Sequence, residues 1–353
     1  MPDKLASILL APAGLLYGVI MSGRNALYDS GLFRSWRSPI PVISVGNITT
    51  GGTGKTPLTD WIVKFYHRCG KKTAIVSRGY GRSTKGPLLV SDGKTLLVGS
   101  REAGDEVAML AARNPASIVV VAENRREGVE LILRELKGGL PEVIVLDDAF
   151  QHRRIARDLD IVVINAEEPF GRGRMLPAGR LREPLRGLRR ADLIILNKVT
   201  DEHEAHGIVK KLKPAGKPVI LSRTRPGKLV PVDSETAAGG EKIEEEPLRA
   251  LAFAGIAAPD GFVRTLGEAN VQVVKSSFFR DHQPFTADSL RSVVSDSKRL
   301  GLIPVTTEKD WFRIRDDREL RRILEGSGCR FLQIEPDLSE GSSLLEKMLR
   351  DLL

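Results

Sequence analysis

Residues 49–56 of this chain, Thr-Thr-Gly-Gly-Thr-Gly-Lys-Thr, have the types and spacing of a phosphate-binding loop. The glycines let backbone N–H groups converge on phosphate oxygens, and a helix N-terminus behind them adds partial positive charge. Lys55 would neutralise the β- and γ-phosphates, and the Thr56 hydroxyl would ligate Mg²⁺. The full pattern has a glycine where Thr49 stands. The predicted nucleotide-binding residues are Thr49, Thr50, Gly51, Gly52, Thr53, Gly54, Lys55 and Thr56.

Two pairs of carboxylates could act beside this loop. Asp147 and Asp148 end an apolar run, as in a Walker B strand, and Asp147 would hold Mg²⁺ directly or through water. The alternative is a carboxylate that caps the next element. Asp105 and Glu106 open a predicted helix, where a carboxylate can be catalytic or can serve only as an N-terminal cap.

Basic and polar side chains extend the candidate site. Gln151 and His152 follow the Asp147–Asp148 pair closely enough to lie at the same edge. Residues 171–184 place four arginines, Arg182 among them, and Glu183 between glycines and prolines. Guanidinium groups suit phosphate recognition, although a solvated basic loop would have the same composition.

The elements that must position these residues follow an α/β rhythm. Near-continuous apolar strands are expected at 42–45, 73–77, 117–121, 143–148, 160–165 and 192–197. Helices alternate with them, which predicts a parallel sheet covered on both faces. Residues 88–91 and 95–98 flank Asp92-Gly93 and predict a hairpin. A second α/β set is expected from Leu248, with strands at 248–254, 271–276, 303–306 and 330–334.

Four segments are therefore expected along the chain: an N-terminal amphipathic membrane-associated helix (1–38), a P-loop domain (39–217), a connector (218–247) and a smaller second α/β domain (248–353). Leu5 to Met21 carries no charge, but its length is at the lower limit for spanning a bilayer, roughly 17 residues. A spanning helix, a signal peptide and a buried core helix are alternatives to a helix that lies on the membrane surface.

Composition limits the partners. The net charge of +9 favours an acidic partner: nucleic acid, anionic lipid or a phosphorylated substrate. Nucleic acid is disfavoured, because only 5% of the residues are aromatic and the arginines lie in glycine-rich turns. The two cysteines have no metal-ligand spacing and suit a reducing compartment. His203 and His206 are read as a solvated helix face, not a metal site.

Six motifs occur together and in order: 45–57, 77–82, 104–106, 146–153, 173–184 and 307–310. This set resembles the tetraacyldisaccharide 4'-kinases, the lipid A 4'-kinases of Gram-negative bacteria, over nearly the whole chain. That family also carries threonine at the Thr49 position. The resemblance implies a kinase at the cytoplasmic face of the inner membrane, peripheral or monotopic, that uses ATP and Mg²⁺. It would phosphorylate the 4'-hydroxyl of an acylated glucosamine disaccharide 1-phosphate and yield lipid IVA.

The resemblance also implies site residues. Asp105 would be the catalytic base, His282 its partner from the second domain, and Lys55 a catalytic cation. Thr56, Asp147 and Asp148 would hold the metal. The residues with a substrate-binding or an accessory role would be Arg78, Glu106, Gln151, His152, Arg182 and Glu183. Protein partners are left unassigned. Gln283 stands where the family often has a second histidine.

Two other classes share parts of this pattern. A P-loop GTPase or metallochaperone also uses Gly-Gly-x-Gly-Lys-Thr, and Asn197-Lys198 resembles a guanine-reading motif. The acidic residue of that motif is displaced, however, because Asp201 lies one position too late, and Thr50 stands where the related dimeric ATPases have lysine. The other class is a membrane-binding module with an inert nucleotide site, which the intact set of Lys55, Thr56 and Asp147 disfavours.

Overall fold

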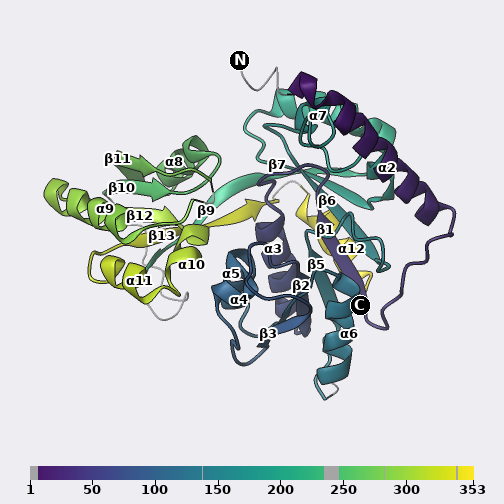
Figure 1. The fold of residues 1–353 in the computed structure, drawn as a ribbon, viewed down its shortest axis with the longest axis horizontal. Coiled ribbons are helices and arrows are strands. Elements are labelled where there is room, and N and C mark those ends of the chain that lie inside the picture. Colours follow the sequence, from purple (N-terminus) through teal and green to yellow (C-terminus); the bar gives the residue numbers. More distant parts are fainter. Residues whose placement is uncertain (1–6, 137, 234–245, 282, 339–340) are drawn as a thin grey trace.

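The computed structural model describes residues 7–136, 138–233, 246–281, 283–338 and 341–353. These residues form two α/β lobes, each built on its own sheet, with an N-terminal helix along the outside of the larger lobe (Figure 1). The predicted α/β class, with a large parallel sheet and a smaller second α/β unit, is confirmed. One expected site residue, His282, lies outside the described residues.

The first lobe contains an eight-stranded sheet in the order β3-β4-β2-β5-β1-β6-β7-β8. Its strands are β1 Val42–Gly46, β2 Thr73–Ser77, β3 Leu88–Asp92, β4 Ile118–Val121, β5 Val143–Asp147, β6 Leu159–Asn165, β7 Leu193–Asn197 and β8 Val219–Leu221. All neighbours run parallel except β3 and β4. β1 and β5 pair in a register that places Val45 opposite Asp147, so the glycine loop and the acidic pair leave the sheet at the same edge.

Helices cover both faces of this sheet, as its buried strands require. They are α3 Lys55–Arg68, α4 Ser100–Ala103, α5 Asp105–Arg113, α6 Arg125–Glu135, α7 Glu202–Leu212 and α12 Ser342–Arg350, with 3₁₀ turns η1 Gly171–Gly173, η2 Leu185–Arg190 and η3 Lys213–Ala215. Alternate residues of a strand face opposite layers. Ile43 and Val45 pack with α3, α5 and α12, whereas Val42 packs with α6.

The second lobe contains a five-stranded sheet in the order β11-β10-β12-β13-β9. Its elements are β9 Arg223–Pro231, β10 Leu248–Ala254, α8 Pro259–Glu268, β11 Val271–Phe278, α9 Ala287–Leu300, β12 Ile303–Thr307, α10 Glu308–Ile314, α11 Arg318–Leu324 and β13 Arg330–Asp337. The four strands expected from Leu248 onward are all present. β9 runs antiparallel to β13, and the other neighbours are parallel.

Two expectations about local structure need correction. Residues 95–98 do not form the second strand of a hairpin: a single bridge joins Ser91 to Leu96 at the outer edge of β3, and the exposed side chains of Leu96 and Leu97 have no layer to pack against. The segment 218–247 is more than a connector. β8 completes the first sheet and β9 is an edge strand of the second, while residues 234–245 lie outside the described part.

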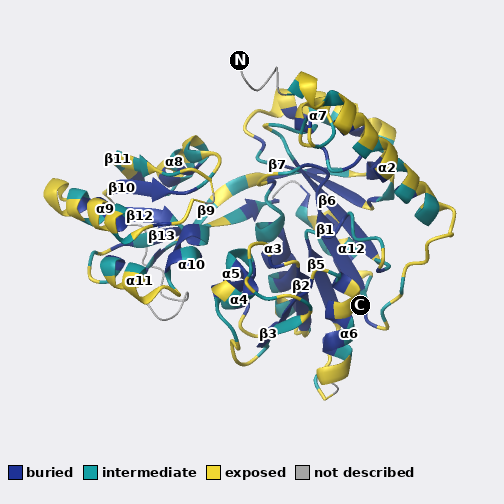
Figure 2. Ribbon diagram, viewed as in Figure 1, coloured by how far each residue is buried: buried dark blue, intermediate teal, exposed yellow. Residues whose placement is uncertain are grey.

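The N-terminal helix α2 runs from Ala11 to Asp29, beyond the apolar run that predicted it. Pro12 stands in its first turn, where a missing N–H is tolerated. The helix presents many large apolar side chains to solvent, Leu15 at 73% and Val19 at 68% exposure among them (Figure 2). Within the described residues, no helix has the length and apolarity needed to cross a membrane.

Candidate active site

The glycine loop joins the end of β1 to the start of α3. Gly51 and Gly54 have φ of 113° and 92°, a region that L side chains rarely adopt. At Gly54 a Cβ would also lie 2.0 Å from Nδ2 of Asn197. That amide donates to the Thr53 carbonyl over 2.9 Å. Only glycine therefore allows the loop to close against β7.

Asn197 thus supports the backbone of the phosphate loop, a role that the sequence did not reveal. Its side chain is bonded to the loop and not presented to a base. Asp201, the displaced residue of the guanine-reading pattern, caps α7 by accepting from the Glu204 N–H at 2.8 Å. The geometry gives Asn197 and Asp201 structural roles and offers nothing that favours a guanine site.

Asp147 and Asp148 are adjacent but have opposite electrostatic surroundings. Asp147 is 2% exposed and accepts from the hydroxyls of Thr59 at 3.2 Å and Ser77 at 3.1 Å. Burial, reinforced by the charges of Glu106 and Asp148, raises the pKa of Asp147 to about 6. Burial also raises the pKa of Asp148, but the positive charges of Lys55 and Arg182 lower it by more, to about 2.

Asp148 is the point where the expected site residues converge. Its backbone is left-handed, with φ of 47°, so the extended conformation of β5 ends at this residue. Arg182 donates to both of its oxygens, at 2.7 and 2.9 Å, and Nζ of Lys55 lies 3.7 Å from Oδ1. The structure therefore brings together the basic loop, the Walker B pair and the phosphate-loop lysine, as the sequence predicts.

Arg125 holds this backbone in place, and the sequence analysis missed it. Its side chain is 1% exposed and donates to the carbonyls of Asp147 at 2.9 Å, Asp148 at 3.2 Å and Ala122 at 2.8 Å. Burial lowers its pKa to about 10. The sequence signal was weak, because an arginine in the first turn of a predicted helix is ordinarily a surface residue.

Asp105 and Glu106 lie at the start of α5, and both contact α10 of the second lobe. Oδ2 of Asp105 is 3.6 Å from Nε of Arg313, and Oε1 of Glu106 accepts from Nζ of Lys309 at 2.8 Å. Burial opposes ionisation of Glu106, but Lys309 and, more weakly, Lys55 lower its pKa. The preceding Gly104 is required, because a Cβ there would lie 2.9 Å from the Tyr80 carbonyl.

The motif at residues 307–310 builds this contact between the lobes. Asp310 is fully buried and accepts from Thr307 Oγ1 at 2.8 Å and from the Gly255 N–H at 3.0 Å. Glu308 pairs with the buried Arg113 of α5. The sequence suggested the importance of this motif without revealing that its residues join the lobes.

Arg313 also donates to the carbonyl of Gln283 at 2.8 Å. It therefore links the segment that contains Gln283 to Asp105.

Two of the remaining accessory residues, Gln151 and Glu183, contact helix α2. Nε2 of Gln151 donates to the Asn47 carbonyl and to Oε1 of Glu183, both at 2.8 Å. Burial, together with the charges of Arg125 and Arg78, lowers the pKa of His152 to about 3, so this imidazole is neutral at physiological pH. Arg78 is exposed.

Whether this site could hold Mg²⁺ depends on the oxygen donors that its residues offer. The described residues contain no group of three or more His, Cys, Asp or Glu side chains arranged to hold a metal. Mg²⁺ usually takes one or two carboxylates together with water and substrate phosphates. A hydroxyl from Thr56 and a carboxylate from Asp147 are hard oxygen donors of this kind. The pKa of Asp147 is raised first by burial and then by the charges of Glu106 and Asp148, and a cation would offset both effects on its anionic form. The residues fit the ion.

A glycine loop between a central parallel strand and a helix, with a Walker B pair beside it, defines a P-loop nucleotide-binding protein. Residues 6–353 match the model of the family described as tetraacyldisaccharide-1-P 4'-kinase. The chain belongs to that family.

Similar proteins agree with this assignment. The tetraacyldisaccharide 4'-kinase of Chlorobaculum tepidum is 60% identical over 100% of this chain and 99% of its own length. The tetraacyldisaccharide 4'-kinase of Chlorobaculum parvum is 61% identical over 100% of this chain and 97% of its own length. A crystal structure of LpxK from Aquifex aeolicus in complex with ATP has a TM-score of 0.76 and 32% identity, covering 98% of this chain and 99% of that one. The protein is accordingly a kinase of lipid A biosynthesis that uses ATP.

Proposed function

We propose that this chain transfers the γ-phosphate of ATP to the 4'-hydroxyl of tetraacyldisaccharide 1-phosphate, giving lipid IVA, with Asp105 as the base. The observation that carries the assignment of residues is a convergence of charged groups of the first lobe, two of which also contact Lys309 and Arg313 of the second lobe. Asp148 contacts Lys55 of the loop. Glu106, adjacent to Asp105, lies close enough to both for the charge of Lys55 to lower its pKa and that of Asp148 to raise it. The acceptor side of the site thus lies within electrostatic reach of the phosphate side.

In this mechanism residues 49–56 hold the triphosphate, and Lys55 neutralises charge as the bond between the γ-phosphorus and the β,γ-bridging oxygen breaks and ADP leaves. Asp105 accepts the proton of the sugar hydroxyl as its oxygen attacks in line. His282 is proposed as the partner of Asp105. Support comes from Arg313, which contacts both Asp105 and the carbonyl next to that histidine. Positioning and charge neutralisation supply most of the rate enhancement in such reactions.

Mg²⁺ would supply Lewis-acid stabilisation of the β- and γ-phosphate oxygens. Thr56, Asp147 and Asp148 would hold it. The contacts of Asp148 with Arg182 and Lys55 fix the orientation of that carboxylate. Thr59 and Ser77 do the same for Asp147 by donating to its two oxygens.

The exposed apolar surface of α2 supports docking on a membrane, at the cytoplasmic face of the inner membrane where ATP is available. Large apolar side chains gather on one side of the helix, Leu15, Leu16, Val19 and Ile20 among them. A monomeric soluble protein rarely exposes so many together. A helix lying in the interface would let the acyl chains of the substrate stay in the lipid phase while the sugar reaches the site.

The activity test uses detergent-solubilised protein, Mg²⁺, γ-labelled ATP and tetraacyldisaccharide 1-phosphate. Label should move to the lipid, and Asp105→Ala should abolish the transfer. Transfer that survives in this variant would place the base elsewhere. Binding of ATP without any transfer would refute the kinase function.

Docking is tested separately by sedimentation with phospholipid vesicles. The triple variant Leu16→Gln, Val19→Gln, Ile20→Gln should stay in the supernatant, whereas the wild type sediments. The matched control changes two exposed leucines elsewhere, Leu300→Gln and Leu344→Gln, and should sediment like the wild type. Equal sedimentation of all three proteins would exclude α2 as the docking element.

A further inference from the structure

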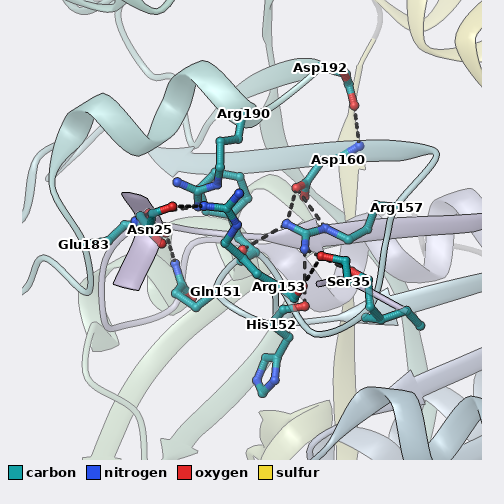
Figure 3. A network of polar contacts seen from close by, with 12 residues as sticks. Asn25, Ser35, Gln151, His152, Arg153, Arg157, Asp160, Glu183, Arg190 and Asp192 are labelled. Atoms are coloured by element: carbon teal, nitrogen blue, oxygen red, sulfur yellow. Dashed lines mark hydrogen bonds and ion pairs between the residues drawn. The ribbon is translucent and has the colours of Figure 1, made fainter. Parts of the chain in front are cut away.

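The buried carboxylate of Glu183 is the point where α2 meets the nucleotide side of the first lobe. Glu183 is 0% exposed. Its Oε2 accepts from Nδ2 of Asn25 at 3.1 Å and from Arg190 at 2.8 Å, and its Oε1 accepts from Gln151 at 2.8 Å. Figure 3 shows these side chains converging from α2, from η2 and from the loop after β5. A buried carboxylate needs such donors, so Asn25 belongs to the polar interior.

Gln151 carries this contact on to the phosphate loop. The same Nε2 that donates to Glu183 also donates to the Asn47 carbonyl at 2.8 Å. Nδ2 of Asn47, in turn, donates to Oγ1 of Thr53 inside the loop at 3.2 Å. A displacement of Glu183 would therefore act on both the entry and the middle of the loop.

The residue before Glu183 provides a second route. Arg182 holds the Asp148 carboxylate with its guanidinium group, and its backbone N–H donates to the Ile48 carbonyl at 2.8 Å. Its own carbonyl accepts from the Tyr17 hydroxyl of α2 at 3.0 Å. Helix α2 thus contacts residues 182–183 at two positions that are about two turns apart.

The two sides of α2 differ in chemistry. Leu16 and Ile20 project into solvent, whereas Tyr17 and Asn25 face the lobe and bond to residues 182 and 183. Backbone atoms reinforce the inner side: Arg153 donates to the Asn25 carbonyl at 2.9 Å, and Arg24 donates to the Gln151 carbonyl. The placement of α2 on the lobe is therefore joined by hydrogen bonds to the segments that shape the ATP site.

We propose that Glu183 is a positioning residue for the ATP site and that Asn25 fixes its place, so that the seating of α2 on the lobe sets the affinity for ATP. The inference rests on the proposed role of residues 49–56 in holding ATP. Glu183 and Asn25 act through Gln151, Asn47 and Arg182 and touch no substrate themselves. Loss of the Asn25 amide leaves a buried charged acceptor short of one donor, and this shortage is relieved only if Glu183 moves.

The test measures the dissociation constant of ATP by calorimetry on the full chain in detergent micelles, without lipid substrate. Asn25→Leu should weaken ATP binding about tenfold, the equivalent of one lost hydrogen bond to a charged group. Asn25→Ser keeps a hydrogen-bond donor, so its dissociation constant for ATP should lie between those of the wild type and Asn25→Leu. It is also the milder variant to measure if Asn25→Leu does not fold. Ser22→Ala, on the same helix, is the matched control and should bind ATP like the wild type.

A double-mutant cycle shows whether the effect passes through Glu183. Asn25→Leu should cost little further affinity in a Glu183→Gln background, whereas additive losses would mean that the two residues act separately and would overturn the inference. Wild-type ATP affinity in the Asn25 variants would overturn it too, even if their melting temperatures fall. If Lys55→Ala binds ATP as tightly as the wild type, the proposed role of the loop fails instead.

Discussion

The carboxyl edge of the first sheet and the contact between the lobes hold acidic groups in different ways. Asp147 and Asp148 are bonded within their own lobe, to Thr59, Ser77 and Arg182. Asp105 and Glu106 start a first-lobe helix but face Arg313 and Lys309 of the second lobe. The contacts of the proposed nucleotide half therefore lie within one lobe, whereas those of the proposed acceptor half join both.

The largest effect is expected within the first lobe. Lys55→Ala should lower kcat/KM by roughly three powers of ten, because phosphoryl transfer depends on fixed positive charge at the phosphates. Steady-state transfer of label from ATP to lipid in detergent micelles measures this loss. Lys210→Ala, at an exposed lysine of α7, is the control and should leave the rate unchanged. A loss of less than tenfold in Lys55→Ala would remove this lysine from the catalytic group.

A change in the acceptor half should affect turnover without affecting ATP binding. Asp105→Asn removes the proposed base and keeps its shape, so kcat should fall by about 10² to 10⁴ while the dissociation constant of ATP stays within about twofold. Asp288→Asn, at an exposed carboxylate on α9, serves as the control. A parallel loss of ATP affinity in the Asp105 variant would show that the two halves of the site are not separate.

The contact between the lobes should contribute to the stability of the protein. Glu308→Gln weakens the pairing of the buried Arg113, whose pKa is raised by Glu308 and Asp60 against the effect of burial. The free energy of unfolding should fall by about 2 kcal/mol, as expected for the loss of hydrogen bonds to a charged group. Chemical denaturation measures this change, and Glu319→Gln is the exposed control. An unchanged unfolding midpoint would mean that Arg113 is satisfied without the second lobe.

The smallest expected effect is a pH-dependent change in stability from His67, which lies at the amino ends of strands β2 and β4. His67 bonds to the hydroxyls of Thr73 at 2.9 Å and Ser117 at 3.1 Å, and burial lowers its pKa although the charge of Asp60 acts in the other direction. In the unfolded chain the pKa of a histidine is about 6.5. Above that pH, His67 is neutral in both the folded and the unfolded state, and the stability that its two hydrogen bonds contribute is fully present. It declines as the pH falls below 6.5 toward the folded pKa, because only the unfolded state takes up the proton there.

Urea unfolding at several pH values between 5 and 8 checks this dependence. The loss of stability toward low pH should be smaller in His67→Gln than in the wild type. Parallel curves for the two proteins would contradict the prediction.

The parts of the site that the sequence predicted are local in the chain. A β-branched run, a glycine loop and an amphipathic helix follow one another directly, so β1, residues 49–56 and α3 could be placed from spacing alone. The Asp147–Asp148 pair was found in the same way, because the apolar run before it identifies a strand. Strand order then brings loop and carboxylates together, as parallel pairing of β1 and β5 requires.

The parts that the sequence did not predict depend on contacts between distant segments. Asn25 meets Glu183 across 158 positions, and Asn197 supports Thr53 across 144. Arg125 looked like a surface residue because its partners are backbone carbonyls, which leave no signal in side-chain types. Strand β9 was taken for part of a connector because its pattern is that of an edge strand, which buries few of its side chains.

The last helix has a consequence for how the protein is made. Leu345 and Leu349 of α12 belong to the core around α3, and the Leu349 carbonyl accepts from the Tyr66 hydroxyl at 2.8 Å. In chain order the second lobe is therefore an insertion within the first. During synthesis the hydrophobic layer behind the phosphate loop stays open until α12 leaves the ribosome, so the inserted lobe can fold earlier than the lobe that binds ATP.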